Sequence, residues 1–351
     1  MTSPGGDVAR RDEPILSVRN LVIEFRTSEG ALRAVDDVSF DLYPGETLGV
    51  VGESGSGKTV TVLSILGLLP RPAGRIASGE IWFEGRNLVD LPKREMRKLR
   101  GGKIGMVFQD PMTSLNPVLR VGYQIAETLK VHQRSLTDSE VRARGEELLT
   151  SVHVPNAAKR YDQFPHQYSG GMRQRAMIAI ANANTPQVLI ADEPTTALDV
   201  TIQAQVLDSL QDARDQTGAS MIIITHDLGI IAELADRVIV MYGGRIAETG
   251  DVHTIFARPS HPYTVGLLGS LPRLDAETDR LTPIGGQPPS LSKIPPGCAF
   301  HPRCRIGRDR ELCHTVRPDL VRSESGALTA CHFHEEVPAE FERLGIGGGG
   351  P

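Results

Sequence analysis

A glycine-rich loop between an apolar strand and a helix constrains the fold of this chain more than any other feature. Residues 47–51 are apolar enough for a buried strand, and the loop GESGSGKT follows at residues 52–59. We expect a helix to begin at Lys58 and to run to about Leu69, because two prolines follow soon afterwards. A strand, a glycine loop and a helix in this order predict an α/β core that binds the phosphates of a nucleotide.

Individual positions of this P-loop match the needs of phosphate binding. Glycine has no side chain, so the amides of Gly55, Gly57 and their neighbours can converge on a phosphate at the positive end of the helix. Lys58 would reach the β- and γ-phosphates, and the hydroxyl of Thr59 would bind Mg²⁺. An unrelated glycine turn would not need the flanking strand and helix. The candidate nucleotide-binding residues of the loop are Gly52, Ser54, Gly55, Ser56, Gly57, Lys58 and Thr59.

Two adjacent carboxylates follow a second apolar strand. Residues 188–191 predict a buried strand that leads into Asp192, and Glu193 comes next. An acid at the end of a buried strand is well placed to bind Mg²⁺. The carboxylate that follows it is well placed to orient or deprotonate an attacking water. A surface turn is the alternative, and the upstream glycine loop argues against it. Asp192 is therefore the second candidate Mg²⁺ residue beside Thr59, and Glu193 is the candidate catalytic base.

Composition favours a soluble globular protein of one or two domains. The chain has 351 residues, of which 40% are hydrophobic and 23% are charged. Its net charge of −5 argues against a dedicated nucleic-acid binder, because such proteins are usually basic. The most apolar stretch, residues 60–69, is far shorter than the roughly 20 residues of a membrane span. The first residues lack the pattern of a secretory signal, so we expect a cytoplasmic chain.

The order of the predicted elements divides the chain into regions. Residues 1–13 are polar and are expected to be disordered. An α/β domain is expected over 14–270, and it begins with an antiparallel β portion because residues 15–25 alternate like strands. A helical subdomain is expected as an insertion over about 111–180. The apolar run 238–242 precedes two glycines, which predicts a β-hairpin.

The composition changes after about residue 270. Prolines crowd the following stretch, and all four cysteines of the chain lie between residues 298 and 331. We therefore expect a distinct, loop-rich C-terminal cysteine module over 271–337 that is held by something other than a hydrophobic core. A tail is expected over 338–351.

Further motifs occur in the order of the ATP-binding-cassette (ABC) ATPases, and the chain resembles that family of P-loop NTPases. Gln109 resembles the glutamine that contacts Mg²⁺ and the attacking water, and His226 resembles the histidine that touches the γ-phosphate. Phe25 stands at the position of the aromatic residue that stacks on adenine. The residues that resemble the family signature and the D-loop are Ser169, Gly170, Gly171 and Asp199. The resemblance implies ATP and Mg²⁺ as cofactors and ATP hydrolysis as the activity.

The signature loop also has a chemical rationale. A hydroxyl and two glycines at the start of a helix form a second anion site, and Ser169 lies far along the chain from Lys58. In the resembled family this loop faces the ATP of a partner, which implies a second ABC ATPase subunit, a homologue of this chain. Met172 departs from the glutamine of many cassettes, and Asn182 is polar where an apolar helix residue is expected.

Three segments resemble the ATPase subunits of oligopeptide and dipeptide importers. They are residues 108–117, 191–201 and 261–264. This resemblance implies a translocase ATPase that powers peptide import, without nucleic acid as a partner. The implied partners are two transmembrane permease subunits and an extracytoplasmic peptide-binding protein. The implied location is peripheral, at the cytoplasmic face of the cell membrane.

Three alternatives stay open beside peptide import. Close relatives of the importers carry nickel or other small solutes. Soluble ABC ATPases of translation or DNA repair commonly have two cassettes or a long coiled coil, and the sequence has neither. A protein that holds ATP without turnover is disfavoured by the presence of Lys58, Glu193 and His226.

The four cysteines follow the pattern C-x5-C-x8-C-x17-C, which lacks the CxxC spacing of common zinc ribbons. Disulfides are rare in a reducing cytoplasm, and four thiolates suit an iron–sulfur cluster. In the resembled importer ATPases this module is associated with a [4Fe–4S] cluster. Zn²⁺ is the alternative metal because nearby histidines could replace a thiolate, and four unrelated buried thiols are the third possibility. The cysteines are Cys298, Cys304, Cys313 and Cys331, and the histidines are His301, His314, His332 and His334.

Overall fold

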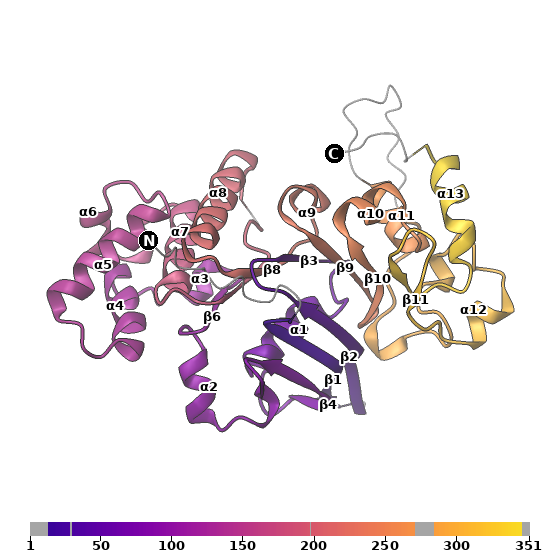
Figure 1. Cartoon of the computed structure of the whole chain (residues 1–351), viewed down its shortest axis with the longest axis horizontal. Helices are drawn as coiled ribbons and strands as arrows, with labels where there is room; N and C mark the ends of the chain where they lie inside the picture. The colour runs from indigo at the N-terminus through magenta and orange to yellow at the C-terminus, as the bar shows by residue number, and fades with distance from the viewer. Residues whose placement is uncertain (1–12, 29, 197, 271–283, 346–351) are drawn as a thin grey trace, which may run out of the picture.

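Two β-sheets form the framework of the chain (Figure 1). The computed structural model describes residues 13–28, 30–196, 198–270 and 284–345. The larger sheet has eight strands in the order β11-β12-β10-β9-β3-β8-β7-β6, and the smaller sheet has four in the order β2-β1-β4-β5. The predicted α/β core is confirmed. The predicted disordered segment 1–13 lies outside the described residues except for Glu13.

The centre of the larger sheet is parallel and is buried on both faces. Its strands are β3 (Thr47–Val51), β6 (Ile104–Val107), β7 (Val188–Asp192), β8 (Ser220–Ile224) and β9 (Arg237–Tyr242). Along β7, Leu189 and Ala191 join one hydrophobic cluster, whereas Val188 and Ile190 join another. Strands that are covered on both faces are apolar along their whole length. This explains why residues 188–191 do not alternate between apolar and polar side chains.

The helix after the glycine loop, α1 (Lys58–Ile65), ends earlier than the sequence predicts. Gly67 has a φ of 60°. Its N–H donates to the carbonyl of Ser64 at 2.9 Å, and the N–H of Leu68 donates to the carbonyl of Leu63 at 2.8 Å. A glycine in the left-handed conformation lets the chain satisfy the last carbonyls of a helix. The helix therefore stops before the prolines that were expected to end it.

The smaller sheet is the antiparallel N-terminal β portion, drawn in indigo and purple in Figure 1. Its side chains share one hydrophobic cluster with α1 and with one face of the parallel sheet. The antiparallel pairing of its first two strands confirms the expectation from residues 15–25. The elements of this region are β1 (Leu16–Thr27), β2 (Gly30–Leu42), β4 (Gly74–Phe83), β5 (Arg86–Asn87), η1 (Leu88–Asp90) and α2 (Lys93–Leu99).

A group of helices lies between β6 and β7, at the left of Figure 1. Tyr161 fills its centre and is 8% exposed. A Cβ added at Gly122 or Gly145 would come within 2.3 or 2.4 Å of the Tyr161 ring, so only glycine fits at these two positions. The helices are α3 (Pro111–Ser114), α4 (Val121–His132), α5 (Asp138–Ser151), α6 (Ala157–Tyr161), η2 (Pro165–Gln167) and α7 (Gly170–Asn182).

The polar residue at the end of α7 joins this helix to α8 (Val200–Thr217). Asn182 is buried, and its side-chain amide donates to the carbonyl of Ala213 at 3.1 Å. A buried polar group is tolerated where it finds a hydrogen-bond partner. The structure thus gives Asn182 a packing role that the sequence did not reveal.

The predicted hairpin joins β9 to β10 (Arg245–Asp251). Gly243 and Gly244 connect the two strands, with φ angles of 55° and 81°. Two successive residues with positive φ form the type I′ turn that matches the twist of paired strands. The predicted hairpin is confirmed.

The C-terminal module continues the larger sheet, because Glu248 of β10 pairs with Thr329 of β12. Phe300 and Phe341 are buried in the same hydrophobic cluster as the parallel strands, so the expectation of a module without core packing is wrong. The expectation of a tail over 338–351 also differs from the structure, because helix α13 extends to Arg343 and buries Phe341. The elements that complete the chain are α9 (Leu228–Leu234), α10 (Val252–Ala257), α11 (Pro262–Leu268), η3 (Leu291–Lys293), η4 (His301–Arg303), α12 (Glu311–Thr315), β11 (Val321–Arg322), β12 (Leu328–Thr329), η5 (His334–Glu336) and α13 (Val337–Arg343).

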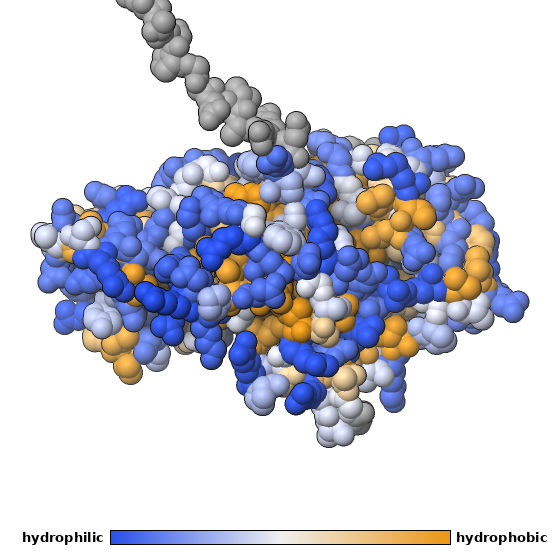
Figure 2. Space-filling model, turned by 60° about the horizontal axis from the view of Figure 1, so that its bottom comes forward, coloured by the Kyte–Doolittle hydropathy of each residue, from blue (hydrophilic) through white to orange (hydrophobic). Residues whose placement is uncertain are grey.

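The face of the molecule drawn in Figure 2 is mainly hydrophilic. Figure 2 shows one face on which charged and polar side chains surround several apolar areas. In the part of the chain that the structure describes, no helix combines the length and the apolar character that crossing a bilayer requires.

Candidate functional site

The glycine loop connects the end of β3 to the start of α1 and needs its glycines for steric reasons. Gly52 and Gly57 have φ angles of 147° and 100°. A Cβ on Gly52 would lie 2.2 Å from the carbonyl oxygen of Met241, and one on Gly57 would lie 2.8 Å from that of Ala34. The loop therefore packs closely against the neighbouring backbone. Its other side lies at the start of α1, where phosphate is expected to bind.

Lys58 is held at the base of this loop. Its amine donates to the carbonyl of Gly52 at 2.7 Å and to that of Glu53 at 3.0 Å, and the residue is 5% exposed. Burial lowers the pKa of Lys58, and the carboxylates of Glu193, Asp192 and Glu53 act in the opposite direction. A cation that is desolvated and surrounded by carbonyl oxygens is well prepared to bind an anionic oxygen.

Two of the three candidate Mg²⁺ residues, Thr59 and Asp192, lie in contact although they are 133 residues apart in the chain. The hydroxyl of Thr59 donates to Oδ1 of Asp192 at 3.1 Å. Burial raises the pKa of Asp192 to about 6, and the hydrogen bond from Thr59 opposes that shift. A hydroxyl and a carboxylate are hard oxygen donors of the kind that Mg²⁺ prefers.

The three candidate catalytic residues converge at the carboxylate of Glu193. Its Oε2 accepts hydrogen bonds at 2.9 Å from the side-chain amide of Gln109 and from the hydroxyl of Thr196. Nδ1 of His226 lies 3.8 Å from the same oxygen. Glu193 has a φ of 46°, a left-handed conformation that costs a non-glycine residue about 1–2 kcal/mol. Backbone strain at this carboxylate is typical of a functional position.

Gln109, Glu193 and His226 line one cavity of about 350 Å³ beside the phosphate loop, whereas Gly52 and Asp192 are not among its lining residues. Its volume is within the range of small-molecule sites. Leu291 of η3 and Ala34 of β2 also line it, and neither was expected from the sequence. The predicted site residues that line it are Ser54, Gly55, Ser56, Gly57, Lys58, Thr59, Gln109, Glu193 and His226.

The signature residues lie outside this cavity, at the start of α7. The hydroxyl of Ser169 accepts a hydrogen bond from the N–H of Met172 at 3.3 Å, which caps the helix. Gly171 packs on α8, because a Cβ there would lie 2.4 Å from Cγ2 of Ile202. Asp199 caps α8 by accepting from the N–H of Ile202 at 3.0 Å. The structure thus brings the signature and Asp199 to adjacent helix starts.

Phe25 has a different environment from the phosphate loop. It lies in β1, pairs with Gly74 of β4 and packs against the hydrophobic cluster of the smaller sheet. Among the described residues, the set that lines the phosphate-loop cavity does not include it. Its contact with adenine stays a prediction.

The four cysteines of the C-terminal module line one small cavity, together with Phe300, His301 and His332. All four are free thiols. Burial raises the pKa of Cys298 to about 11 and that of Cys331 to about 12. Within the described ranges, no group of three or more His, Cys, Asp or Glu residues is arranged so that it could hold a metal ion.

Several residues at the site carry no motif that could have identified them. Thr196 holds Glu193, and Leu291 reaches the cavity from the C-terminal module. Arg303 binds the carboxylate of Glu53 inside the phosphate loop, although 250 residues separate the two. Contacts between distant segments leave no local pattern in a single sequence.

Lys58→Ala should weaken ATP binding by roughly ten- to a hundredfold, because hydrogen bonds to charged groups contribute about 1.5–3 kcal/mol. Titration of the purified chain with a fluorescent ATP analogue measures this. Lys98→Ala, which changes a surface lysine paired with Glu95, is the control and should bind as the unaltered chain does. Unchanged binding by Lys58→Ala would rule out the phosphate-loop assignment.

Glu193→Gln should retain ATP binding and lower turnover by roughly 10²–10⁴-fold, as expected for the loss of a general base. Phosphate release and nucleotide titration measure the two quantities separately. Glu147→Gln removes a carboxylate whose side chain is 65% exposed and should change neither. Substantial hydrolysis by Glu193→Gln would show that another group activates the water.

Comparison with known proteins agrees with this arrangement. The family model described as ABC transporter matches residues 35–196. The model described as the oligopeptide/dipeptide transporter C-terminal region matches residues 247–313. Among solved structures, the chain is similar to the dimeric ATP-binding cassette MJ0796 in a post-hydrolysis state bound to ADP and Pi. The TM-score is 0.61 at 28% identity, over 68% of this chain and 98% of that chain.

Two curated relatives come from Bacillus subtilis (strain 168). The chain is 51% identical to the dipeptide transport ATP-binding protein DppD, over 89% of this chain and 93% of the relative. It is 47% identical to the oligopeptide transport ATP-binding protein AppD, over 93% of this chain and 98% of the relative. The chain therefore belongs to the ABC transporter family, among its dipeptide and oligopeptide transport ATP-binding proteins.

Proposed function

We propose that this chain hydrolyses ATP to power the import of peptides through a separate pair of membrane-spanning permease subunits. One observation carries the ATPase assignment, namely that the phosphate loop, Gln109, Glu193 and His226 line a single cavity. The match to the oligopeptide/dipeptide transporter C-terminal region and the names of the relatives support peptides as the solute. No specific observation favours nickel transport or a soluble role outside transport.

Each residue of the cavity has a defined task in this proposal. Phosphate oxygens would replace the carbonyls of Gly52 and Glu53 as acceptors for Lys58. Thr59 and Asp192, with Gln109, would hold Mg²⁺, which neutralises charge on the phosphates when bound. Glu193 would accept a proton from the attacking water. Because Gln109 and Thr196 fix its carboxylate, the base needs little reorganisation.

We assign the signature residues to the nucleotide of a second ABC ATPase subunit. Ser169, Gly170 and Gly171 stand outside the cavity that Lys58 lines, at a helix start suited to an anion. The related cassette MJ0796 is described as dimeric. Asp199 at the adjacent helix start would then lie near the same contact between subunits. This pairing would make each ATP site depend on both chains.

The proposed location is peripheral, at the cytoplasmic face of the membrane, with an extracytoplasmic peptide-binding protein delivering the solute. Apolar side chains exposed on the helical region support contact with the permeases. Met112, Val118 and Tyr123 are 61%, 76% and 58% exposed, and all three follow closely after Gln109 in the chain. Movement at Gln109 could therefore be passed between the permease and the ATP site.

We retain the predicted domain limits as a proposal with one change. The nucleotide-binding domain spans 14–270 and includes the helical subdomain over about 111–180. The cysteine module spans 271–337, and we extend it to residue 343 because α13 packs into the core. The limits near residue 270 and the segment 346–351 lie outside the described residues.

We propose that the cysteine module holds a [4Fe–4S] cluster. The residue types suit a cluster, since Cys298, Cys304, Cys313 and Cys331 line one cavity and cluster ligands are cysteine thiolates, but the described side chains are not arranged as a metal site. Such a cluster would join segments of the module that little regular secondary structure connects. Zn²⁺ is the alternative, with His301 or His332 as the nearby nitrogen donors.

Anaerobically purified protein should contain about four iron and four sulfide per chain and should be brown. Colorimetric iron and sulfide assays and absorption spectra measure this. Cys304→Ser should lose most of the iron, whereas Ser292→Ala, a change of an exposed polar residue in the same module, should keep it. A colourless preparation with stoichiometric zinc would favour the alternative metal.

Cells that depend on this chain for dipeptide uptake should lose that uptake when Glu193→Gln replaces the unaltered chain. Accumulation of a radiolabelled dipeptide measures this, and Glu147→Gln is the control. Nickel accumulation should stay unchanged in the same cells. Loss of nickel uptake with normal peptide uptake would reject the peptide assignment.

A further inference from the structure

The phosphate loop is bound to the cysteine module by a partly buried ion pair, in which the side chain of Glu53 is 26% exposed. Nη1 and Nη2 of Arg303 bind Oε2 and Oε1 of Glu53 at 2.5 and 2.9 Å. The side chain of Arg303 is only 5% exposed. Bidentate pairs of this kind are the strongest hydrogen-bonded contacts between side chains and fix orientation as well as distance. Glu53 is therefore held by a residue from the far end of the chain.

Arg303 is itself fixed within the module. Its Nε donates to the carbonyl of Gly285 at 3.0 Å, and Nη2 lies 3.3 Å from the carbonyl oxygen of Gly286. The guanidinium lies 5.9 and 6.0 Å from the ring centres of Tyr242 and Phe300. A cation held in this way cannot move away from Glu53 without losing several contacts.

The backbone of Glu53 is anchored as well. Its N–H donates to the hydroxyl of Tyr263 at 2.8 Å, and its carbonyl accepts from Lys58 at 3.0 Å. Tyr263 is fully buried, and its ring lies 4.6 Å from that of Tyr242 and 5.4 Å from that of Phe300. The phosphate loop thus rests on an aromatic cluster to which the module contributes Phe300.

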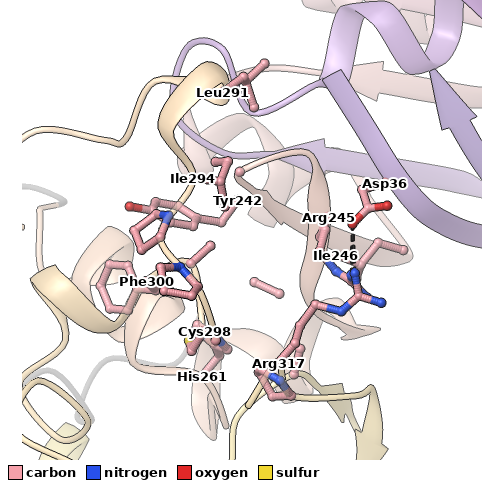
Figure 3. A pocket seen from close by; sticks show the side chains of 18 of the residues that line it. Asp36, Tyr242, Arg245, Ile246, His261, Leu291, Ile294, Cys298, Phe300 and Arg317 are labelled. Carbon is pink, nitrogen blue, oxygen red and sulfur yellow. Dashed lines mark hydrogen bonds and ion pairs between the residues drawn. The ribbon is translucent and has the colours of Figure 1, made fainter. Parts of the chain in front are cut away.

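This aromatic cluster lies beside the cysteines. Figure 3 shows Tyr242, Phe300 and Cys298 on the walls of the cavity between the module and β10, with Leu291 at its upper end. Cys304 follows Arg303 directly in the chain. Phe300 and Arg303 therefore lie on the same short segment, residues 298–304, as two of the cysteines.

Charge gives the ion pair a role in nucleotide binding. Glu53 belongs to the phosphate loop, and its carbonyl accepts a hydrogen bond from Lys58 at 3.0 Å, so its carboxylate stands on the segment that would bind the phosphates. An uncompensated carboxylate there would repel the phosphates of ATP. Arg303 supplies the compensating charge, and burial keeps that charge from being screened by solvent.

We propose that Arg303 is a positioning residue for nucleotide binding: it neutralises Glu53, holds the phosphate loop and makes ATP affinity depend on the C-terminal module. This rests on the proposed function, in which the phosphate loop binds ATP. Leu291 of the same module lines the nucleotide cavity and provides a second connection. Any rearrangement of the segment around Cys298 and Cys304 would then move Arg303 and so alter the affinity of the site for ATP.

The test compares the full chain with Arg303→Gln, Glu53→Gln and the double variant. Arg303→Gln should weaken binding of a fluorescent ATP analogue by about tenfold, because Glu53 is left uncompensated. Glu53→Gln should bind within about twofold of the unaltered chain. The double variant should recover to within about threefold, since replacing both partners removes the repulsion. A purely structural role for Arg303 would give no such recovery.

The matched control is Arg310→Gln. Arg310 forms a bidentate pair with Glu336 inside the same module, at 2.6 and 2.7 Å, without reaching the phosphate loop. It should leave ATP affinity unchanged. Should Arg303→Gln not fold, the double variant still tests charge compensation, because it has no charge on either partner; a tenfold loss of ATP binding there would contradict charge compensation.

Two outcomes separate this inference from the proposed function. If Arg303→Gln binds ATP normally while Lys58→Ala does not, the phosphate-loop assignment stands and the role of Arg303 is rejected. If the unaltered chain and Lys58→Ala bind ATP equally, the proposed function itself fails. Failure of Glu53→Gln to restore binding in the double variant would also reject charge compensation.

Discussion

The register of three parallel strands is the constraint on which the site depends. Ile224 at the end of β8 pairs with Val50 of β3 on one side and with Asp192 of β7 on the other. The carboxyl ends of all three strands therefore lie at one level. The phosphate loop leaves from β3, the two acids from β7, and His226 follows β8. A slip by one residue in either pairing would separate these groups, because neighbouring residues on a strand face opposite sides.

The parts of the site that depend on local sequence could be predicted, and those that depend on distant contacts could not. The glycine loop, Asp192, Glu193 and the hairpin at Gly243 each have a pattern readable over a few residues. Leu291 has none, since its role exists only once a distant segment reaches the cavity, and Thr196 lies only three residues after Glu193 but carries no motif that marks its hydrogen bond. The early end of α1 depends on Gly67, whose left-handed conformation ends the helix before the prolines that the sequence pattern favours as its end. The packing of the cysteine module was missed because a proline-rich composition hides a few well-placed aromatic residues.

The ABC core and the C-terminal module are joined by contacts of three kinds. They share the larger sheet through β10 and β12, a hydrophobic cluster through Phe300 and Phe341, and the ion pair of Arg303 with Glu53. Ion pairs contribute little to stability at the surface and more where water is excluded. Arg303 of the C-terminal module therefore supports the phosphate loop although it is 250 residues away from Glu53 in the sequence.

The continuation of the sheet has a consequence for shortened forms of the chain. β10 pairs with β9 along one edge and with β12 along the other, and Glu248 in its middle is fully buried. Its carboxylate accepts from the N–H groups of Ser260 and His261, and burial raises its pKa to about 7. A polypeptide that stopped before β11 would leave the outer edge of β10 open, with backbone groups unpaired beside a desolvated acid. An open strand edge is a template for pairing with strands of other molecules, so β10 is the place where we expect a shortened chain to associate.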